Sequence, residues 1–143
     1  MYCSPVWNSL LQRDIDVIER VQRRFTKRIS GLQHLPYEER LRKLNALSLQ
    51  KLRTFANIIT IHKSLRSGMS ADFGLSLASA STRSGGTRLV QRRATKKIAS
   101  SLFYCRAPST WNKLPISLVL NYSKQSLSGF KKSLKKHLNK FPV

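Results

Sequence analysis

Six carboxylates are the only acidic side chains of this sequence, and they decide whether the chain can hold catalytic metal ions. Phosphoryl transfer with two metal ions requires acidic side chains clustered around the paired cations. Asp14 and Asp16 are two positions apart, so on a helix they would point about 200° away from each other. Glu38 and Glu39 diverge by about 100° and fit a simpler role at a helix start, where the dipole favours negative charge. The sequence therefore predicts no metal-dependent nuclease or polymerase centre within this chain.

Histidine and cysteine give no catalytic or zinc signature. His34, His62 and His137 fall on different predicted elements, and no pair has the HExxH or CxxC spacing of a zinc site. A nucleophilic Cys–His pair stays open at Cys105, although a cysteine behind two aromatic residues is more often a small core residue. The Gly-Gly pair lacks the flanking strand, helix and lysine of a phosphate-binding loop. We therefore expect no cofactor and no bound metal.

Positive charge is the chemistry that this sequence does supply. The stretch IERVQRRFTKRI, residues 18–29, has five cations among twelve side chains, and the whole chain has a formal net charge of +21. Such an excess repels itself in a compact domain unless something acidic neutralises it. Phosphodiesters are the first candidate and anionic membrane surfaces the second. No run approaches the roughly 18 apolar residues of a membrane-spanning helix, so the predicted partners are RNA and DNA, with no membrane.

An amphipathic helix over residues 9–30, capped by Ser9, is predicted to position these cations. Apolar residues recur every three or four positions and should form its buried face. They are Leu11, Ile15, Ile18, Val21, Phe25 and Ile29. Four cations fall on the opposite side and two more flank them. A helix packed on its own domain by the apolar face would present the cations to phosphates.

The predicted phosphate-binding set extends to a second basic stretch, residues 88–97, and to a lysine-rich last helix. It comprises Arg13, Arg20, Arg23, Arg24, Lys27, Arg28, Arg92, Arg93, Lys96, Lys97, Lys131 and Lys135. The alternative for each is a solvated charged surface, although surfaces built only for solubility usually mix signs. Trp7 and Trp111 could stack on bases, but their apolar neighbourhoods favour a place in the core.

The periodicity predicts a mainly α fold in three parts. Residues 1–66 should form a short, thumb-like helical bundle, and residues 67–88, rich in Ser, Gly and Ala, a flexible connector. Residues 89–143 should form a basic C-terminal extension with a short helix, a bend at Pro108, a turn and a last basic helix. The two cysteines are too few for a disulfide scaffold. They are expected as reduced thiols of an intracellular protein, in the nucleus or a cytoplasmic ribonucleoprotein.

Within the first part, two helices should follow the basic one. The stretch LPYEERLRKL predicts a helix over residues 35–44, opened by Pro36. A further helix is expected from about Ser48 to Arg66, with Gly68 at its end. In the last helix, Leu127, Phe130, Leu134 and Leu138 should form the buried face.

Two blocks of the sequence resemble a known family. The first comprises YCSPVWN, DIDVIERVQRRFTKRISGL and LPYEERLRKLNALSL, and the second is FYCRAPSTWNKLP. Together they resemble the region after the polymerase core in reverse transcriptases of non-LTR (LINE-type, jockey-like) retrotransposons. The matching positions are Tyr2, Val6-Trp7-Asn8, Ile18-Glu19, Val21-Gln22-Arg23, Phe25, Tyr37, Arg40-Leu41, Phe103-Tyr104, Arg106, Trp111-Asn112, Leu114-Pro115, Phe130-Lys131 and Leu134.

The resemblance implies a C-terminal fragment of an RNA-directed DNA polymerase, comprising its thumb and C-terminal extension. Its basic helix would lie along the template–primer duplex, and the missing polymerase core would be a second partner. The family's catalytic Tyr-x-Asp-Asp motif is not in this sequence. Ser9 replaces a usual Pro, and QKLRTFAN departs from a third helix in which acidic residues are common. Two alternatives stay open: a non-functional retroelement remnant, or a basic RNA-binding module in a new context.

The purified chain should extend no primer on an RNA or DNA template, with either Mg²⁺ or Mn²⁺ present. The reason is that its carboxylates are too few and too scattered to hold two metal ions. A primer-extension assay measures this directly. Template-directed incorporation above the level of a protein-free control would contradict the expectation.

Overall fold

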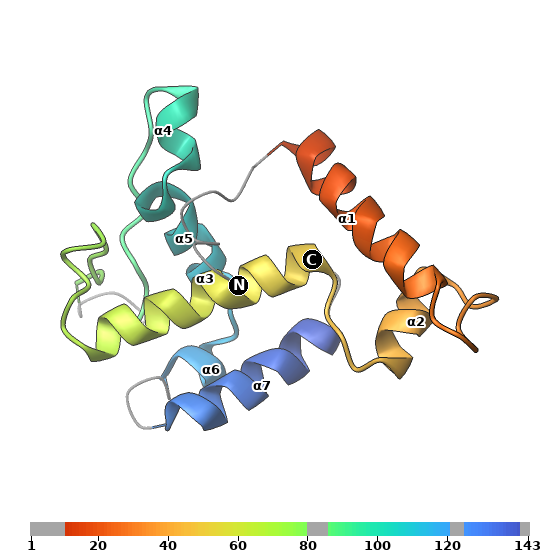
Figure 1. Ribbon diagram of the computed structural model, residues 1–143. Coiled ribbons are helices and arrows are strands. Elements are labelled where there is room, and N and C mark those ends of the chain that lie inside the picture. Colours follow the sequence, from red (N-terminus) through yellow and green to blue (C-terminus); the bar gives the residue numbers. More distant parts are fainter. Residues whose placement is uncertain (1–10, 80–85, 121–124, 141–143) are drawn as a thin grey trace.

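The computed structural model describes residues 11–79, 86–120 and 125–140, and this part of the chain is mainly α, as the sequence predicts (Figure 1). It contains seven helices and no strand. They are α1 (Gln12–Lys27), α2 (Tyr37–Lys43), α3 (Leu49–Arg66), α4 (Lys97–Ser101), α5 (Phe103–Asn112), α6 (Ile116–Leu120) and α7 (Leu127–Lys140). The predicted cap Ser9 lies outside the described residues.

Helix α3 is the central element, and α1, α5 and α7 all pack against it (Figure 1). Its start at Ser48 confirms the sequence prediction, because the Ser48 side chain accepts a hydrogen bond from Lys51 N at 3.3 Å. Ile58, Ile61 and His62 are fully buried along it. A helix covered on several sides does not show the simple two-faced pattern, and the buried residues of α3 accordingly include Arg53, Asn57 and Ser64 as well as isoleucines.

The hydrophobic core lies between α3, α5 and α7. Trp111 and Phe130 are fully buried, with ring centroids 6.3 Å apart, and the His62 ring stacks on Phe130 at 4.2 Å. Trp111 Nε1 donates to Thr87 O at 3.0 Å, so its one polar group is satisfied. The expected core role of Trp111 is therefore confirmed, and so is the predicted buried face of α7, on which Leu134 is also fully buried.

The chain is attached to this core both before and after residues 80–85 of the Ser/Gly-rich segment, which lie outside the described ranges. Leu75 and Leu89 are buried, and Leu77 and Leu89 form an isolated antiparallel bridge. The Asn112 side chain pairs with both backbone groups of Leu89, at 2.9 Å each. A loose connector was expected over residues 67–88 from composition, but Leu75 within it is buried in the core, and the amide of Asn112 fixes the adjoining Leu89.

The helical break in the second half falls earlier than predicted. Leu102 has an extended conformation, with φ −64° and ψ 146°, and separates α4 from α5. Pro108 lies inside α5 rather than at a bend, and it is fully buried. The expectation of a bend at Pro108 is therefore wrong. Proline removes one helical hydrogen bond. The helix nevertheless continues through Pro108, whose ring is buried in the core.

Helix α1 also departs from the predicted packing. Leu11, Val21 and Phe25 were expected in the core, but they are 55%, 65% and 67% exposed. The buried side chains of α1 are instead Glu19 and Thr26. Polar contacts thus decide how this helix is rotated about its axis, and part of its apolar side stays in solvent.

Phe130→Ala should lower the free energy of unfolding by about 3–5 kcal/mol, because it deletes a fully buried aromatic ring between His62 and Trp111. Denaturant unfolding followed by circular dichroism measures the change. Val17→Ala, at a half-exposed position of α1, is the control and should change stability by less than about 0.5 kcal/mol. A cost below about 1 kcal/mol for Phe130→Ala would contradict this core.

Candidate nucleic-acid interface

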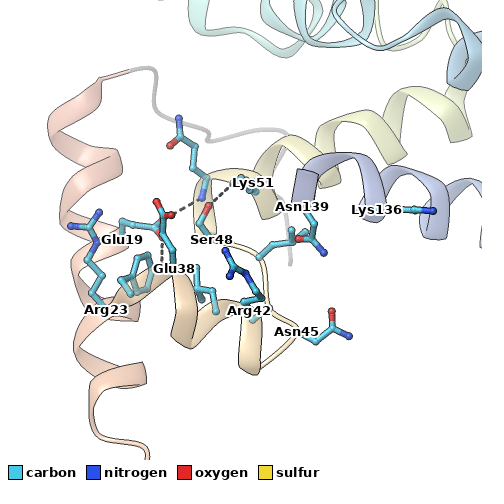
Figure 2. Close-up of a pocket in the computed structure, with 14 residues that line it drawn as sticks. Glu19, Arg23, Glu38, Arg42, Asn45, Ser48, Lys51, Lys136 and Asn139 are labelled. Carbon is cyan, nitrogen blue, oxygen red and sulfur yellow. Dashed lines mark hydrogen bonds between the residues drawn. The ribbon is translucent and has the colours of Figure 1, made fainter. Parts of the chain in front are cut away.

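A buried carboxylate fixes α1 to the rest of the fold. All six carboxylates lie in the described part of the chain, and only Glu19 is buried. Glu19 Oε1 accepts a hydrogen bond from the Tyr37 hydroxyl of α2, and Oε2 accepts one from Gln50 N of α3 at 3.3 Å (Figure 2). A carboxylate shielded from water is costly unless it is hydrogen-bonded. Glu19 therefore links three helices in one arrangement.

Gln22, one turn along α1, extends this anchor. Its Nε2 donates to Leu47 O at 3.2 Å, and its Oε1 lies 3.0 Å from the Tyr37 hydroxyl. Thr26 is buried a further turn on and donates to Gln22 O at 3.0 Å. The side of α1 that faces α2 and α3 is thus polar and closely bonded.

The Tyr37 ring lies between two guanidinium groups. Arg23 Cζ is 5.1 Å and Arg40 Cζ 5.6 Å from the ring centroid, both within the range of cation–π attraction. Arg40 is buried and donates to Leu35 O at 3.0 Å. Burial and the neighbouring Glu19 raise the pKa of Tyr37 well above its usual range. Its hydroxyl therefore stays protonated near neutral pH and continues to donate to the carboxylate.

Four predicted cations are exposed along α1, and we call them the arginine face. It consists of Arg13, Arg20, Arg24 and Lys27. All four are exposed, and they lie on a side of the helix that adjoins the buried Glu19 and Thr26. Arg28, just after the helix, is exposed beside them. Arg23 is exposed as well, but its contact with Tyr37 makes it part of the anchor.

The other predicted cations do not join the arginine face. Arg92, Arg93 and Lys96 are exposed on the segment before α4, and Lys97 begins that helix. Helices α4 and α1 stand well apart in Figure 1. On α7, Lys131 is exposed and Lys135 donates to Asn45 O at 3.1 Å. The structure therefore separates the predicted set into three surfaces.

A cavity of about 860 Å³ opens beside the anchor, where α1, α2, the start of α3 and the end of α7 meet (Figure 2). Four helices each contribute a cation to its walls. They are Arg23, Arg42, Lys51 and Lys136. Glu19 and Glu38 are the acidic residues of the lining, and Glu19 is already bonded within the fold. The cavity is therefore suited to an anion rather than to a cation.

Arg42, Lys51 and Lys136 were not among the predicted site residues. In the sequence, Arg42 has a simpler role as a cation near a helix end, where the dipole favours it. Lys51 and Lys136 lie 85 positions apart in the sequence. Only the packing of α7 against α3 brings them to one cavity, so no sequence signal could have grouped them.

The described part of the chain contains neither a group of metal ligands nor a helix that could span a membrane. Across residues 11–79, 86–120 and 125–140, no three His, Cys, Asp or Glu side chains are grouped as metal ligands would be. No helix in these ranges has the length and apolar character needed to cross a bilayer. Cys105 is buried and has a free thiol.

Comparison of the chain with protein families, with curated proteins and with solved structures finds no match.

Tyr37→Phe should lower the free energy of unfolding by about 1–3 kcal/mol, because it removes a donor to the buried Glu19 carboxylate. The folded state raises the pKa of Tyr37, so its contribution is complete below the ordinary tyrosine pKa of about 10. The difference between parent and variant should therefore shrink as the pH rises above that value.

Denaturant unfolding across neutral and alkaline pH tests this expectation. Glu38→Gln, at an exposed carboxylate on the same cavity wall, is the control and should cost less than about 1 kcal/mol. If Tyr37→Phe were as stable as the parent at neutral pH, Glu19 would not be the anchor of α1.

Proposed function

We propose that this chain binds RNA and DNA through their phosphates, with little sequence preference. In this proposal it is the thumb and C-terminal extension of a non-LTR retrotransposon reverse transcriptase and lacks the catalytic core. The arginine face of α1 is the observation that carries the proposal. Phosphate contacts position a protein on nucleic acid without specifying sequence, which is why little preference is expected.

The anchoring of α1 supports this proposal because a rigid helix holds its cations at fixed spacing. Arg20, Arg24 and Lys27 follow one another at intervals of four and three residues. Such residues are neighbours on a helix surface, about 5–6 Å apart at Cβ. They can therefore contact nearby phosphates of one backbone at a low entropic cost. The inner side of α1, held by Glu19, takes no part in this contact.

The cavity between α2, α3 and α7 offers a second place for the phosphate backbone. Its cations include Arg42, Lys51 and Lys136, and the exposed Lys131 lies on the same helix as Lys136. The proposed partners are a template–primer duplex and a polymerase core on another part of the parent protein. Such a role belongs inside the cell, in the nucleus or a cytoplasmic ribonucleoprotein.

Replacing Arg20, Arg24 and Lys27 together by Gln should weaken binding to RNA and DNA. Each phosphate neutralised adds about −0.7 to −0.9 to the slope of log K against log salt. The triple variant should therefore flatten that slope by roughly two to three units. Fluorescence anisotropy over a salt series measures the slope, and circular dichroism on the same samples checks that the helices persist.

A matched control removes the same charge elsewhere. Lys43 of α2, Lys63 of α3 and Lys113, just after α5, are exposed cations, and their replacement by Gln should change the slope much less. Equal flattening by both triple variants would mean that net charge alone determines binding. An unchanged slope in a folded arginine-face variant would overturn the proposal.

A further inference from the structure

An exposed apolar stripe runs along α1 beside the arginine face. It consists of Val17, Val21 and Phe25, each four residues from the next and each at least half exposed. Phe25 is the most exposed of them, at 67%. An aromatic ring in water is unfavourable unless a partner covers it. The stripe therefore requires an explanation of its own, separate from the phosphate contacts.

The surroundings of Phe25 distinguish it from the other aromatic residues. Trp111 is fully buried, and Phe73 packs edge-on against Phe103 at 6.3 Å. Phe25, in contrast, has Arg24 beside it in the chain and Arg28 three positions on, and both are exposed. On a helix surface, residues three positions apart are neighbours. Arg28 is therefore the helical neighbour of the ring, and Arg24 lies on the adjoining side of α1.

The positive charge around the apolar stripe indicates which kind of partner could cover it. A second copy of this chain would bring another +21 charge to a surface already lined by Arg20, Arg24 and Arg28, so it would be repelled. An unpaired nucleotide matches both the apolar stripe and the cations beside it. Its base has an apolar face that stacks on an aromatic ring, and its phosphate is attracted by the neighbouring arginines. A duplex offers fewer bases that can stack on the Phe25 ring, because its bases are already stacked on one another.

We infer that Phe25 is a stacking platform for an unpaired base of RNA or DNA whose backbone follows the arginine face. This inference rests on the proposed function and adds a preference to it. The chain should bind single strands, or the unpaired bases next to a duplex, more tightly than the duplex alone. Arg20 and Arg24 hold the backbone, and Phe25 contributes a contact that salt does not screen.

The test compares an oligothymidylate with a blunt-ended DNA duplex by fluorescence anisotropy. Phe25→Leu keeps an apolar side chain at an exposed helical position but removes the aromatic face. It should weaken binding to the single strand by about fivefold or more, the lower end of what one stacked base contributes. The affinity for the blunt-ended duplex and both salt slopes should stay unchanged. Val21→Leu, at the neighbouring exposed position, is the matched control and should alter neither affinity.

Phe25→Trp provides a direct readout of stacking. Oligothymidylate should bind this variant at least as tightly as the parent chain. It should also quench the variant's tryptophan emission beyond any change seen in the parent.

The outcomes separate this inference from the proposed function. An equal loss on oligothymidylate and the blunt-ended duplex, or no loss in Phe25→Leu, would overturn the stacking platform and leave the stripe as a protein-docking surface. Absence of quenching in a Phe25→Trp variant that binds the oligonucleotide would overturn it too. The phosphate-binding proposal depends on a different measurement, the salt slope of the arginine-face variant. The stacking platform can therefore fail while the phosphate-binding proposal stands, and the two failures are distinguishable.

Discussion

The buried carboxylate of Glu19 is the constraint on which the orientation of α1 depends. A charged oxygen pair shielded from water must find donors, and the donors available are the Tyr37 hydroxyl on α2 and a backbone N–H of α3. Meeting that requirement turns the polar side of α1 inward. The arginine face then points to solvent, and the apolar stripe is left beside it. The hydrogen bonds of the Glu19 carboxylate thus determine which side chains of α1 are exposed to a partner.

Two polar clamps of this kind connect distant parts of the chain. Glu19, Gln22 and Tyr37 join α1 to α2 and α3. Asn112 and the Trp111 indole join α5 to the returning chain near Leu89 and Thr87. Each clamp couples a side chain to backbone groups distant in sequence, which specifies geometry more sharply than apolar contact does.

Excess charge affects the stability of this fold as well as its binding. The single buried carboxylate is engaged inside the protein, so few acidic groups remain at the surface to offset the cations. Cations from four helices meet around one cavity, and several more share α1. Self-repulsion of this kind weakens the compact state, and an anion that binds the folded form restores stability by mass action. Folding and polyanion binding are thus expected to be linked in this protein.

The sequence by itself determined the helical class, the start of α3 at Ser48 and the buried face of α7. These features follow from local capping and from apolar periodicity, which nearby residues settle. The burial of Trp111 was likewise expected from its apolar neighbourhood. The cations of α1 were also located correctly on its exposed side.

Only the tertiary structure decided which side of α1 faces inward, where the second half of the chain breaks, and which lysines and arginines share a cavity. Periodicity predicts that apolar residues lie on one side, but it does not count the hydrogen bonds that a buried Glu19 must make. Lys51 and Lys136 meet through the packing of two helices far apart in sequence. Local rules cannot anticipate such contacts, because their free energy belongs to groups that come together only in the folded chain.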